Sequence, residues 1–246
     1  MRKQHVLFET VTQRRDDRLI SSPTLRLCGA ALTVLPEGAV WWEQEKMLVV
    51  ADLHFEKGSS FAARGIALPP YDTRATLRRL QVLVTKLKPQ RLIALGDSFH
   101  DRAAETRMDE ADAAALIALT RVTDWIWITG NHDPVPPRRF GSAVHEELSV
   151  GPLIFRHEPQ VAPATGEIAG HLHPVAAVRV RGRRLRRRCV MSDGTRAIMP
   201  AFGAYAGGLN VLDEAYHELM PRSGFHAWMM GAHTVVPVAA ARLEGD

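Results

Sequence analysis

The segment MLVVADLH, residues 47–54, contains five apolar residues in a row, followed at once by an aspartate and, two residues later, a histidine. A continuous apolar run of this length is typical of a β-strand that is buried on both faces. The segments LIALGDSFHD (92–101) and WIWITGNHD (125–133) repeat the arrangement, each with a polar cluster after the apolar run. We therefore predict three buried strands that each end at a group of polar side chains.

Two helical patterns separate these strands. Residues 71–87 place leucine and valine at helical spacing and are followed by Pro89, and residues 105–121 are rich in alanine. The alternation of strand and helix predicts an α/β fold. Ligands of open α/β sheets bind beyond the carboxyl ends of the strands, so the three polar clusters are expected to meet at one rim.

Shorter apolar runs predict further strands at residues 32–35, 39–42, 144–148, 153–156, 167–170, 175–181 and 184–191. The first two flank Pro36-Glu37-Gly38 and the last two flank Gly182-Arg183, so we expect two hairpins. Residues 1–24 are polar and are predicted to form an N-terminal arm, and residues 25–246 are predicted to form a single domain.

The composition is that of an ordinary globular protein of 246 residues, with 46% hydrophobic and 24% charged residues. No apolar run reaches the roughly 18 residues that a membrane-spanning helix needs, and the N-terminal segment lacks the apolar stretch of a secretory signal. We therefore predict a cytoplasmic protein without a membrane partner. In that compartment Cys28 and Cys189 are expected to be reduced.

Side chains that can bind metal gather in five short motifs, namely DLH (52–54), GDSFHD (96–101), GNHD (130–133), RHEP (156–159) and GHLH (170–173). One such motif is weak evidence, but five of them after apolar runs would be a costly use of buried polar groups unless they bind metal. Imidazole, carboxylate and amide ligands together suit Mn, Fe or Zn. The candidate ligands are Asp52, His54, Asp97, Asn131, His157, His171 and His173.

The local backbone is expected to help these ligands converge. In DLH and HLH the two outer side chains point the same way if the backbone is extended, which turns Leu53 and Leu172 into the core. A glycine stands before Asp97, Asn131 and His171, where it allows a tight turn close to the ions. A carboxylate such as Asp97 can also bridge two ions about 3.5–4 Å apart, the spacing of two-metal hydrolases.

The order and spacing of the five motifs resemble those of the calcineurin-like metallophosphoesterase superfamily, over residues 47 to about 175. The resemblance implies a four-layer α/β/β/α sandwich with two facing mixed β-sheets and a dinuclear site. It implies one ion bound by Asp52, His54, Asp97 and His173, and a second bound by Asp97, Asn131, His157 and His171. Arg156 stands before His157 where many members have glycine.

A narrower resemblance covers residues 25 to about 230. The segments DLHFEKGSSFAARGIALPPYDTRATLRRL (52–80) and PAFGAYAGGLNV (200–211) are similar to those of the bacterial ligase-associated metallophosphoesterases, also described as ligase-associated DNA damage response endonucleases. That group is encoded beside an ATP-dependent DNA ligase, an exonuclease and a helicase. The resemblance implies a phosphodiesterase of DNA repair that acts on DNA or RNA, with those three proteins as partners and Mn as the first metal to test.

The motifs also contain candidate residues that do not bind metal. Metal-bound hydroxide is the expected nucleophile, and His132 would stabilise negative charge on the substrate or protonate the leaving oxygen. Asp133 either orients His132 or caps the turn that follows it. The resemblance favours His100 over Asp101 as a contact to the ligands or the substrate. Arg64 either touches a phosphate or is a solvated loop residue.

The segment RVRGRRLRRR, residues 179–188, carries seven arginines and no acidic residue, although the net charge of the whole chain is +4. Such a hairpin attracts polyanions, because each phosphate contact releases counterions. It either contacts nucleic acid or forms a solvated edge that resists pairing with other strands. Alternation places Arg179, Arg181 and Arg183 on one side of the first strand, opposite to Val180.

Three functions are compatible with these observations. The expected one is a dinuclear phosphodiesterase acting on nucleic acid. The alternative enzyme is a hydrolase of a small phosphoester, such as a nucleotide or a pyrophosphate, and cleavage of small esters alone would indicate it. The third is a scaffold of the same fold that has lost metal ligands, which the complete set of seven candidate ligands argues against.

Overall fold

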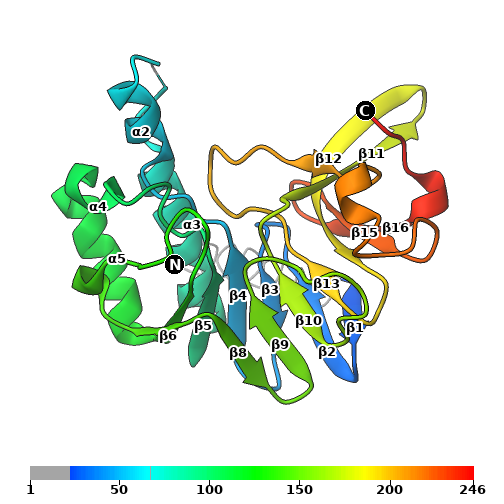
Figure 1. The fold of residues 1–246 in the computed structure, drawn as a ribbon, viewed down its shortest axis with the longest axis horizontal. Helices are drawn as coiled ribbons and strands as arrows, with labels where there is room; N and C mark the ends of the chain where they lie inside the picture. The colour runs from blue at the N-terminus through cyan, green and yellow to red at the C-terminus, as the bar shows by residue number, and fades with distance from the viewer. Residues whose placement is uncertain (1–22, 67) are drawn as a thin grey trace, which may run out of the picture.

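The computed structural model describes residues 23–66 and 68–246, in which two β-sheets pack face to face (Figure 1). Nearly all of the predicted N-terminal arm lies outside the described residues, and the first strand begins at Thr24. None of the helices in the described part of the chain is long and apolar enough to cross a membrane.

The first sheet contains the three strands predicted from the continuous apolar runs. Its strands lie in chain order, as β1 (Thr24–Leu27), β2 (Ala30–Val34), β3 (Val40–Trp42), β4 (Met47–Ala51), β5 (Arg91–Leu95), β6 (Asp124–Ile128) and β7 (Ala143–His145). The strands from β4 to β7 run parallel, and those from β1 to β4 are antiparallel and include the predicted first hairpin. Every residue of β4 is buried, because Leu48 and Val50 pack toward the helices while Met47 and Val49 pack toward the second sheet.

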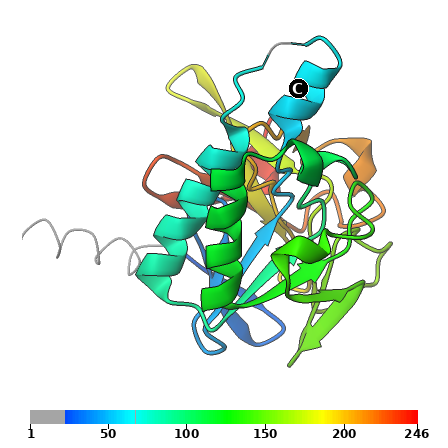
Figure 2. The same ribbon diagram turned by 90° about the vertical axis from the view of Figure 1, so that its left-hand side faces the viewer.

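Helices cover the outer face of this sheet, and they are α2 (Lys57–Ala63), α3 (Asp72–Leu87), α4 (Ala104–Arg107) and α5 (Glu110–Val122). Figure 2 shows α3 and α5 side by side over the sheet. The single helix predicted at 105–121 is wrong, since the chain is extended at Met108 between α4 and α5. Asp109 accepts a hydrogen bond from the backbone N–H of Ala111, and this N-cap starts a new helix.

The second sheet is built from the second half of the chain. Its strands are β8 (Glu147–Val150), β9 (Leu153–Arg156), β10 (Glu167–Ala169), β11 (Pro174–Val180), β12 (Arg183–Ser192), β13 (Ala197–Ile198), β14 (Leu209–Asn210), β15 (His226–Met230) and β16 (Val235–Ala239). They lie in the order β14-β11-β12-β13-β10-β9-β8, and β15 pairs with both β12 and β16. The predicted strands at 153–156 and 167–170 are confirmed as β9 and β10.

The strand predicted at 144–148 is in fact two strands that belong to different sheets. β7 runs parallel to β6 in the first sheet, whereas β8 runs antiparallel to β9 in the second. Glu146 lies between them, where the chain passes from one sheet to the other. The sequence of residues 144–148 contains no glycine or proline that would mark a break. The passage of the chain from β6 as neighbour to β9 as neighbour therefore cannot be predicted from these residues.

The arginine-rich hairpin is formed by β11 and β12, with its turn one residue earlier than predicted. Arg181 and Gly182 occupy the turn at φ angles of 49° and 78°, the left-handed region that a two-residue hairpin turn requires. Val180 is therefore paired directly with Arg183, and the two side chains lie on the same face of the hairpin. The expectation that Arg183 lies opposite to Val180 is wrong.

The four-layer arrangement is confirmed. One core lies between the helices and the first sheet, and a second lies between the two sheets and joins Val49 to Phe155. A third lies on the outer face of the second sheet, around Met191 and Tyr216. In the described part of the chain this outer layer consists of loops with the short 3-10 helices η2 (Glu214–Tyr216) and η3 (Ala240–Arg242) rather than α-helices.

Candidate metal centre

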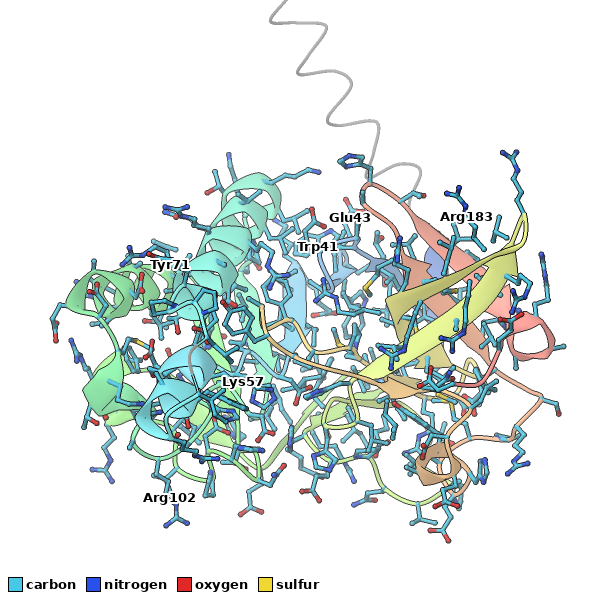
Figure 3. The ribbon with its side chains drawn as sticks, turned by 90° about the horizontal axis from the view of Figure 1, so that it is seen from above. Trp41, Glu43, Lys57, Tyr71, Arg102 and Arg183 are labelled. Carbon is cyan, nitrogen blue, oxygen red and sulfur yellow. The ribbon has the colours of Figure 1, made fainter. Side chains whose placement is uncertain are left out.

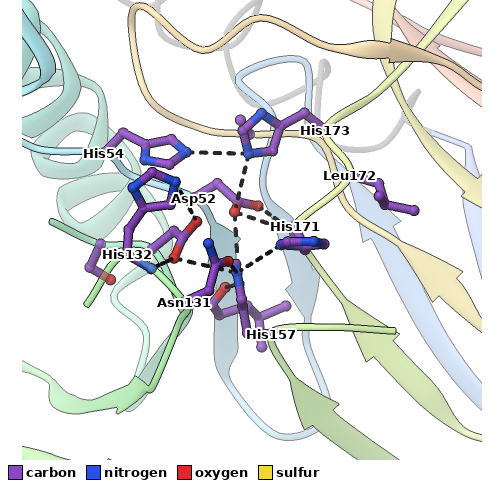
Figure 4. A network of polar contacts seen from close by, with 12 residues as sticks. Asp52, His54, Asn131, His132, His157, His171, Leu172 and His173 are labelled. Carbon is purple, nitrogen blue, oxygen red and sulfur yellow. Dashed lines mark hydrogen bonds and ion pairs between the residues drawn. The ribbon is translucent and has the colours of Figure 1, made fainter. Parts of the chain in front are cut away.

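All seven candidate ligands meet at one rim, beyond the carboxyl ends of strands in both sheets. Figure 4 labels each of them except Asp97. The parallel strands β4, β5 and β6 of the first sheet are followed by Asp52, Asp97 and Asn131. The strands β9 and β10 of the second sheet are followed by His157 and His171. The rim therefore consists of the loops that follow these strands, and both sheets contribute to it.

One group of donors consists of Asp52, His54 and His173, whose ligand atoms all lie within 4.8 Å of one another. His173 Nε2 lies 3.2 Å from Asp52 Oδ1 and 3.3 Å from His54 Nε2. The Asp52 side chain is fully buried. This group contains three of the four ligands that the resemblance implies for the first ion.

A second group consists of Asp97, His157 and His171, again with ligand atoms within 4.8 Å of one another. His157 Nε2 lies 3.4 Å from Asp97 Oδ1 and 3.2 Å from His171 Nδ1. Asn131 Oδ1 lies 2.9 Å from the same nitrogen. These are the four ligands that the resemblance implies for the second ion, and the rim brings all of them together.

The two groups adjoin, since His157 Nδ1 lies 3.8 Å from Asp52 Oδ1. Asp97 falls within the second group and not within the first among the described residues. Its expected role as a bridge between two ions therefore stays a prediction.

Arg156, which replaces the glycine common at this position, does not enter the centre. Its guanidinium pairs with Glu147 at 2.8 Å and lies 3.6 Å from a carboxylate oxygen of Glu167. Side chains alternate along a strand, so Arg156 and His157 point in different directions. An arginine instead of a glycine at position 156 therefore does not displace His157, which still lies beside Asn131 and His171.

The ligand backbone is left-handed, not extended as predicted. Asp52, His54, Asp97, His171 and His173 have φ angles between 44° and 70°. Such conformations cost about 1–3 kcal/mol each in non-glycine residues and are held by surrounding contacts. Two of these contacts are hydrogen bonds, from the His54 N–H to the Asp97 carbonyl at 2.9 Å and from the His171 N–H to Asp52 Oδ2 at 3.1 Å. The turned backbone still directs both outer side chains of each motif to the rim.

Two glycines show how tightly the loops approach the ligands. A Cβ atom on Gly130 would lie 2.3 Å from Asp97 Oδ1, and one on Gly170 would lie 2.6 Å from Asp52 Oδ2. Both distances are far shorter than a carbon–oxygen contact allows. The prediction that glycine is needed beside the ligands is confirmed at these positions.

The donor set fits divalent cations electrostatically. Burial, helped by the neighbouring His173, lowers the pKa of His54 to about 2, so this imidazole is neutral. Burial opposes ionisation of Asp97, but the hydrogen bond with His157 and nearby charges lower its pKa to about 2. Despite its burial, Asp97 and Asp52 raise the pKa of His157 to about 9, which marks a place where positive charge is favoured. His54 and Asp97 are thus already in the form that binds metal, whereas His157 is protonated without an ion and would release that proton on binding one.

His132 stands at the edge of the centre and is oriented by a backbone group. Its Nδ1 lies 2.8 Å from the His100 carbonyl oxygen, and its Nε2 lies 3.9 Å from Asp97 Oδ2. The side chain is 41% exposed. Asp133 does not orient it, because that buried carboxylate accepts hydrogen bonds from the backbone N–H groups of Ser98 and Phe99. Asp133 therefore ties the GNHD loop to the GDSFHD loop.

His100 lies against His132, with ring centroids 5.2 Å apart and planes inclined by 24°. Burial lowers the pKa of His100 to about 4, so the imidazole is neutral. Asp101 instead pairs with Arg107 at 2.8 Å. Of the two residues, His100 is the one that contacts the centre.

Two basic residues at the two ends of α2, Lys57 in its first turn and Arg64 just after its last residue, act on the histidines of the centre, and Arg64 is a candidate from the sequence. The charges of Lys57 and Arg64 both act to lower the pKa of His100, and the charge of Lys57 also acts on His54. Lys57 is half-buried, which lowers its own pKa. Arg64 is exposed and lines a cavity of about 480 Å³ together with Arg102. No local pattern in the sequence distinguishes Lys57 from an ordinary solvated lysine.

The two-sheet sandwich and the two donor groups at its rim define a metal-dependent phosphoesterase. The chain belongs to the calcineurin-like phosphoesterase family, which matches residues 45–188. The nuclease MPE of Pseudomonas putida is 31% identical, with 88% of this chain and 100% of that chain aligned at a TM-score of 0.68. This likeness agrees with the resemblance to the ligase-associated group.

Two other solved structures are more distant. A protein of unknown function from Aquifex aeolicus is 18% identical, with 52% of this chain and 78% of that chain aligned at a TM-score of 0.36. The phosphoesterase Yfce from E. coli is 13% identical, with 79% of this chain and 98% of that chain aligned at a TM-score of 0.41. No curated protein sequence matches the chain significantly.

Proposed function

We propose that the protein is a dinuclear metal-dependent phosphodiesterase that cleaves nucleic acid, DNA or RNA. The observation that carries this proposal is the pair of adjoining donor groups at one rim, where the side chains of Asp52 in one group and His157 in the other approach to 3.8 Å. Two cations side by side suit the transfer of a phosphoryl group, because both oxygens of an in-line displacement need stabilisation.

Seven residues would hold the two ions. Mn is the first metal to test and Fe or Zn also suit the donor set. When bound, the ions would supply Lewis-acid activation of the phosphodiester and of the attacking water. The proposed ligands are Asp52, His54, Asp97 and His173 for one ion, and Asp97, Asn131, His157 and His171 for the other.

His132 is the proposed catalytic residue of the chain itself. The His100 carbonyl accepts a hydrogen bond from Nδ1 of His132, so the Nε2 atom is the one left to face the substrate. As an imidazolium that carries a proton on Nε2 as well, it would stabilise charge on a phosphoryl oxygen or give that proton to the leaving oxygen. Asp133 would keep the loop in place, since it binds the backbone of Ser98 and Phe99.

Nucleic acid is the proposed substrate because the relative from Pseudomonas putida is a nuclease and aligns over its whole length. The narrower resemblance adds a context of DNA repair in the cytoplasm, beside an ATP-dependent ligase, an exonuclease and a helicase. The same resemblance makes these three proteins the proposed partners.

The test is a substrate screen on protein reconstituted with Mn. It compares single- and double-stranded DNA, RNA, a generic small diester and a small monoester. Cleavage of nucleic acid that requires Mn and is lost in His132→Ala is expected. Hydrolysis of small esters without any cleavage of nucleic acid would instead identify a small-phosphoester hydrolase, and no metal binding with no activity would identify a scaffold.

A further inference from the structure

The arginines of the β11–β12 hairpin fall into two sets with different surroundings. Near the tip, Arg179 Nε lies 2.9 Å from a carboxylate oxygen of Glu244, and Arg184 Nη2 lies 2.8 Å from one of Asp246. These acids offset the charges of Arg179 and Arg184, whereas Arg181 and Arg183 are exposed and form no ion pair within the described residues. Arg183 marks this end of the hairpin in Figure 3, on the side of the molecule opposite to Lys57.

The arginines at the base of the hairpin border a cavity of about 190 Å³, lined by Val175, Arg186, Arg187, Arg188, Ala206, Gly207 and Gly208. Arg186 donates a hydrogen bond to the Gly208 carbonyl at 2.8 Å, and Arg187 donates one to the Arg186 carbonyl at 2.9 Å. Arg188 donates to the Ala201 carbonyl at 2.8 Å. The three guanidinium groups are thus held in place by backbone carbonyls.

These carbonyls orient the guanidinium groups but do not neutralise them. Within the described residues, neither Arg187 nor Arg188 forms an ion pair, and Arg186 has one acidic neighbour, Asp246 Oδ1 at 3.4 Å. Arg188 is half-buried, and a desolvated charge is costly without a partner of opposite charge. Two guanidinium groups without an ion pair, and a third that shares Asp246 with Arg184, therefore favour an anionic ligand at this cavity.

The cavity is joined to the metal centre by the loop at residues 201–208. At the start of the loop, the Gly203 N–H donates to the Asp52 carbonyl at 3.1 Å. Just after its end, the Leu209 N–H donates to the His173 carbonyl at 3.2 Å. Both acceptors belong to candidate metal ligands, so one wall of the cavity is anchored directly on the first donor group.

We propose that Arg186, Arg187 and the Gly207-Gly208 backbone bind a phosphate of the nucleic-acid strand, beside the phosphate that lies at the metal centre. The cavity is smaller than the roughly 300–1,000 Å³ of pockets that enclose a whole small ligand, so it suits one phosphate group. Planar guanidinium groups match the oxygens of a phosphate. This inference rests on the proposed function, because it requires a polynucleotide substrate.

The experiment measures binding of a fluorescent single-stranded DNA oligonucleotide by anisotropy, without metal and over a range of salt concentrations. Arg186→Ser with Arg187→Ser is expected to weaken binding about tenfold or more at low salt. The slope of log Kd against log salt should fall by about 0.7 for each phosphate contact that is lost. The matched control, Arg179→Ser with Arg184→Ser, removes the same number of arginines from the paired tip and should leave binding within about twofold.

A second variant tests the cavity without removing arginine. A Cβ atom on Gly207 meets no other atom within 4 Å, so both Gly207→Asp and Gly207→Ser are sterically tolerated. The aspartate should weaken DNA binding by a larger factor than the serine, because only the aspartate adds a negative charge that repels the phosphate. Equal binding by these two variants, or equal losses from the base and tip arginines, would overturn the proposed phosphate site.

The failure of this inference can be told apart from failure of the proposed function. Suppose that the wild-type protein binds and cleaves DNA, but Arg186→Ser with Arg187→Ser binds DNA as well as Arg179→Ser with Arg184→Ser does. The phosphate site alone is then wrong. If the wild-type protein with Mn neither binds nor cleaves DNA or RNA, both are wrong. Cleavage of the small diester is measured in parallel, and the base variants should lose more activity on DNA than on the diester.

Discussion

The backbone carbonyl of His100 lies 2.8 Å from Nδ1 of His132 and accepts its hydrogen bond. This bond fixes the tautomer, because an imidazole that donates from Nδ1 keeps a free lone pair on Nε2 unless it is protonated there as well. It also fixes the direction in which Nε2 points, at 3.9 Å from Asp97 Oδ2. His132 is thereby positioned beside the donor groups without being one of them.

His132→Ala should lower nuclease activity by about 10²–10⁴-fold, the usual contribution of a positioned acid or base. Metal content should stay unchanged, since His132 belongs to neither donor group. Cleavage rates and metal analysis on the same samples check both points. His233→Ala, at an exposed histidine between β15 and β16 that belongs to neither donor group, is the control and should keep full activity. A His132→Ala protein that cleaves DNA at the wild-type rate would remove this residue from the mechanism.

Gly130→Ala should disturb the metal centre through backbone packing alone. The new Cβ would lie 2.2 Å from the Asp97 backbone nitrogen, so the GNHD and GDSFHD loops must move apart. Overpacking of this kind costs about 1–3 kcal/mol of the free energy of unfolding. Calorimetric titration should show weaker Mn binding, and thermal unfolding should show a lower Tm. Gly207→Ala, where the added Cβ meets open space, should show neither change.

The fold and the rim are predictable wherever a local sequence pattern has only one structural solution. A five-residue apolar run that is buried on both faces, as in Met47–Ala51, fits the middle of a covered sheet, and the residue after it must lie at the sheet's rim. This placed Asp52, Asp97 and Asn131 correctly. The glycines beside the ligands were also readable, because close approach is the common reason for glycine there.

What sequence reasoning missed depends on partners distant in the chain. The carbonyl that orients His132 is a backbone group, which any residue at position 100 would supply. The pairing of Arg184 with Asp246 spans 62 positions, and nothing in the sequence distinguishes this arginine from Arg187, which forms no ion pair within the described residues. Left-handed backbone at Asp52 is imposed by surrounding structure, not by the intrinsic preference of the residue.

Asp133 should prove structural, not catalytic. Asp133→Ala leaves the buried N–H groups of Ser98 and Phe99 without an acceptor, which costs about 1–3 kcal/mol for each group. Asp133→Asn keeps one oxygen that can accept from both. Denaturant unfolding should therefore show a clear loss of stability in the alanine variant and a small one in the asparagine variant, with nuclease activity following the same order. Equal loss of activity in both variants with stability unchanged would indicate a direct catalytic role instead.

Mn should stabilise the folded chain, since the donor groups exist only when the loops of both sheets are assembled. A ligand present at about 100 times its Kd raises the free energy of unfolding by about 2.7 kcal/mol for one site. Thermal unfolding with increasing Mn should show a rising Tm, and a chelator should reverse the rise. His171→Ala removes one donor of the second group and should reduce both the rise in Tm and the number of ions bound. His233→Ala should show the full rise, because this exposed side chain belongs to neither group. If Mn leaves the Tm of the wild-type protein unchanged at concentrations that support cleavage, the ions are not bound by these preassembled groups.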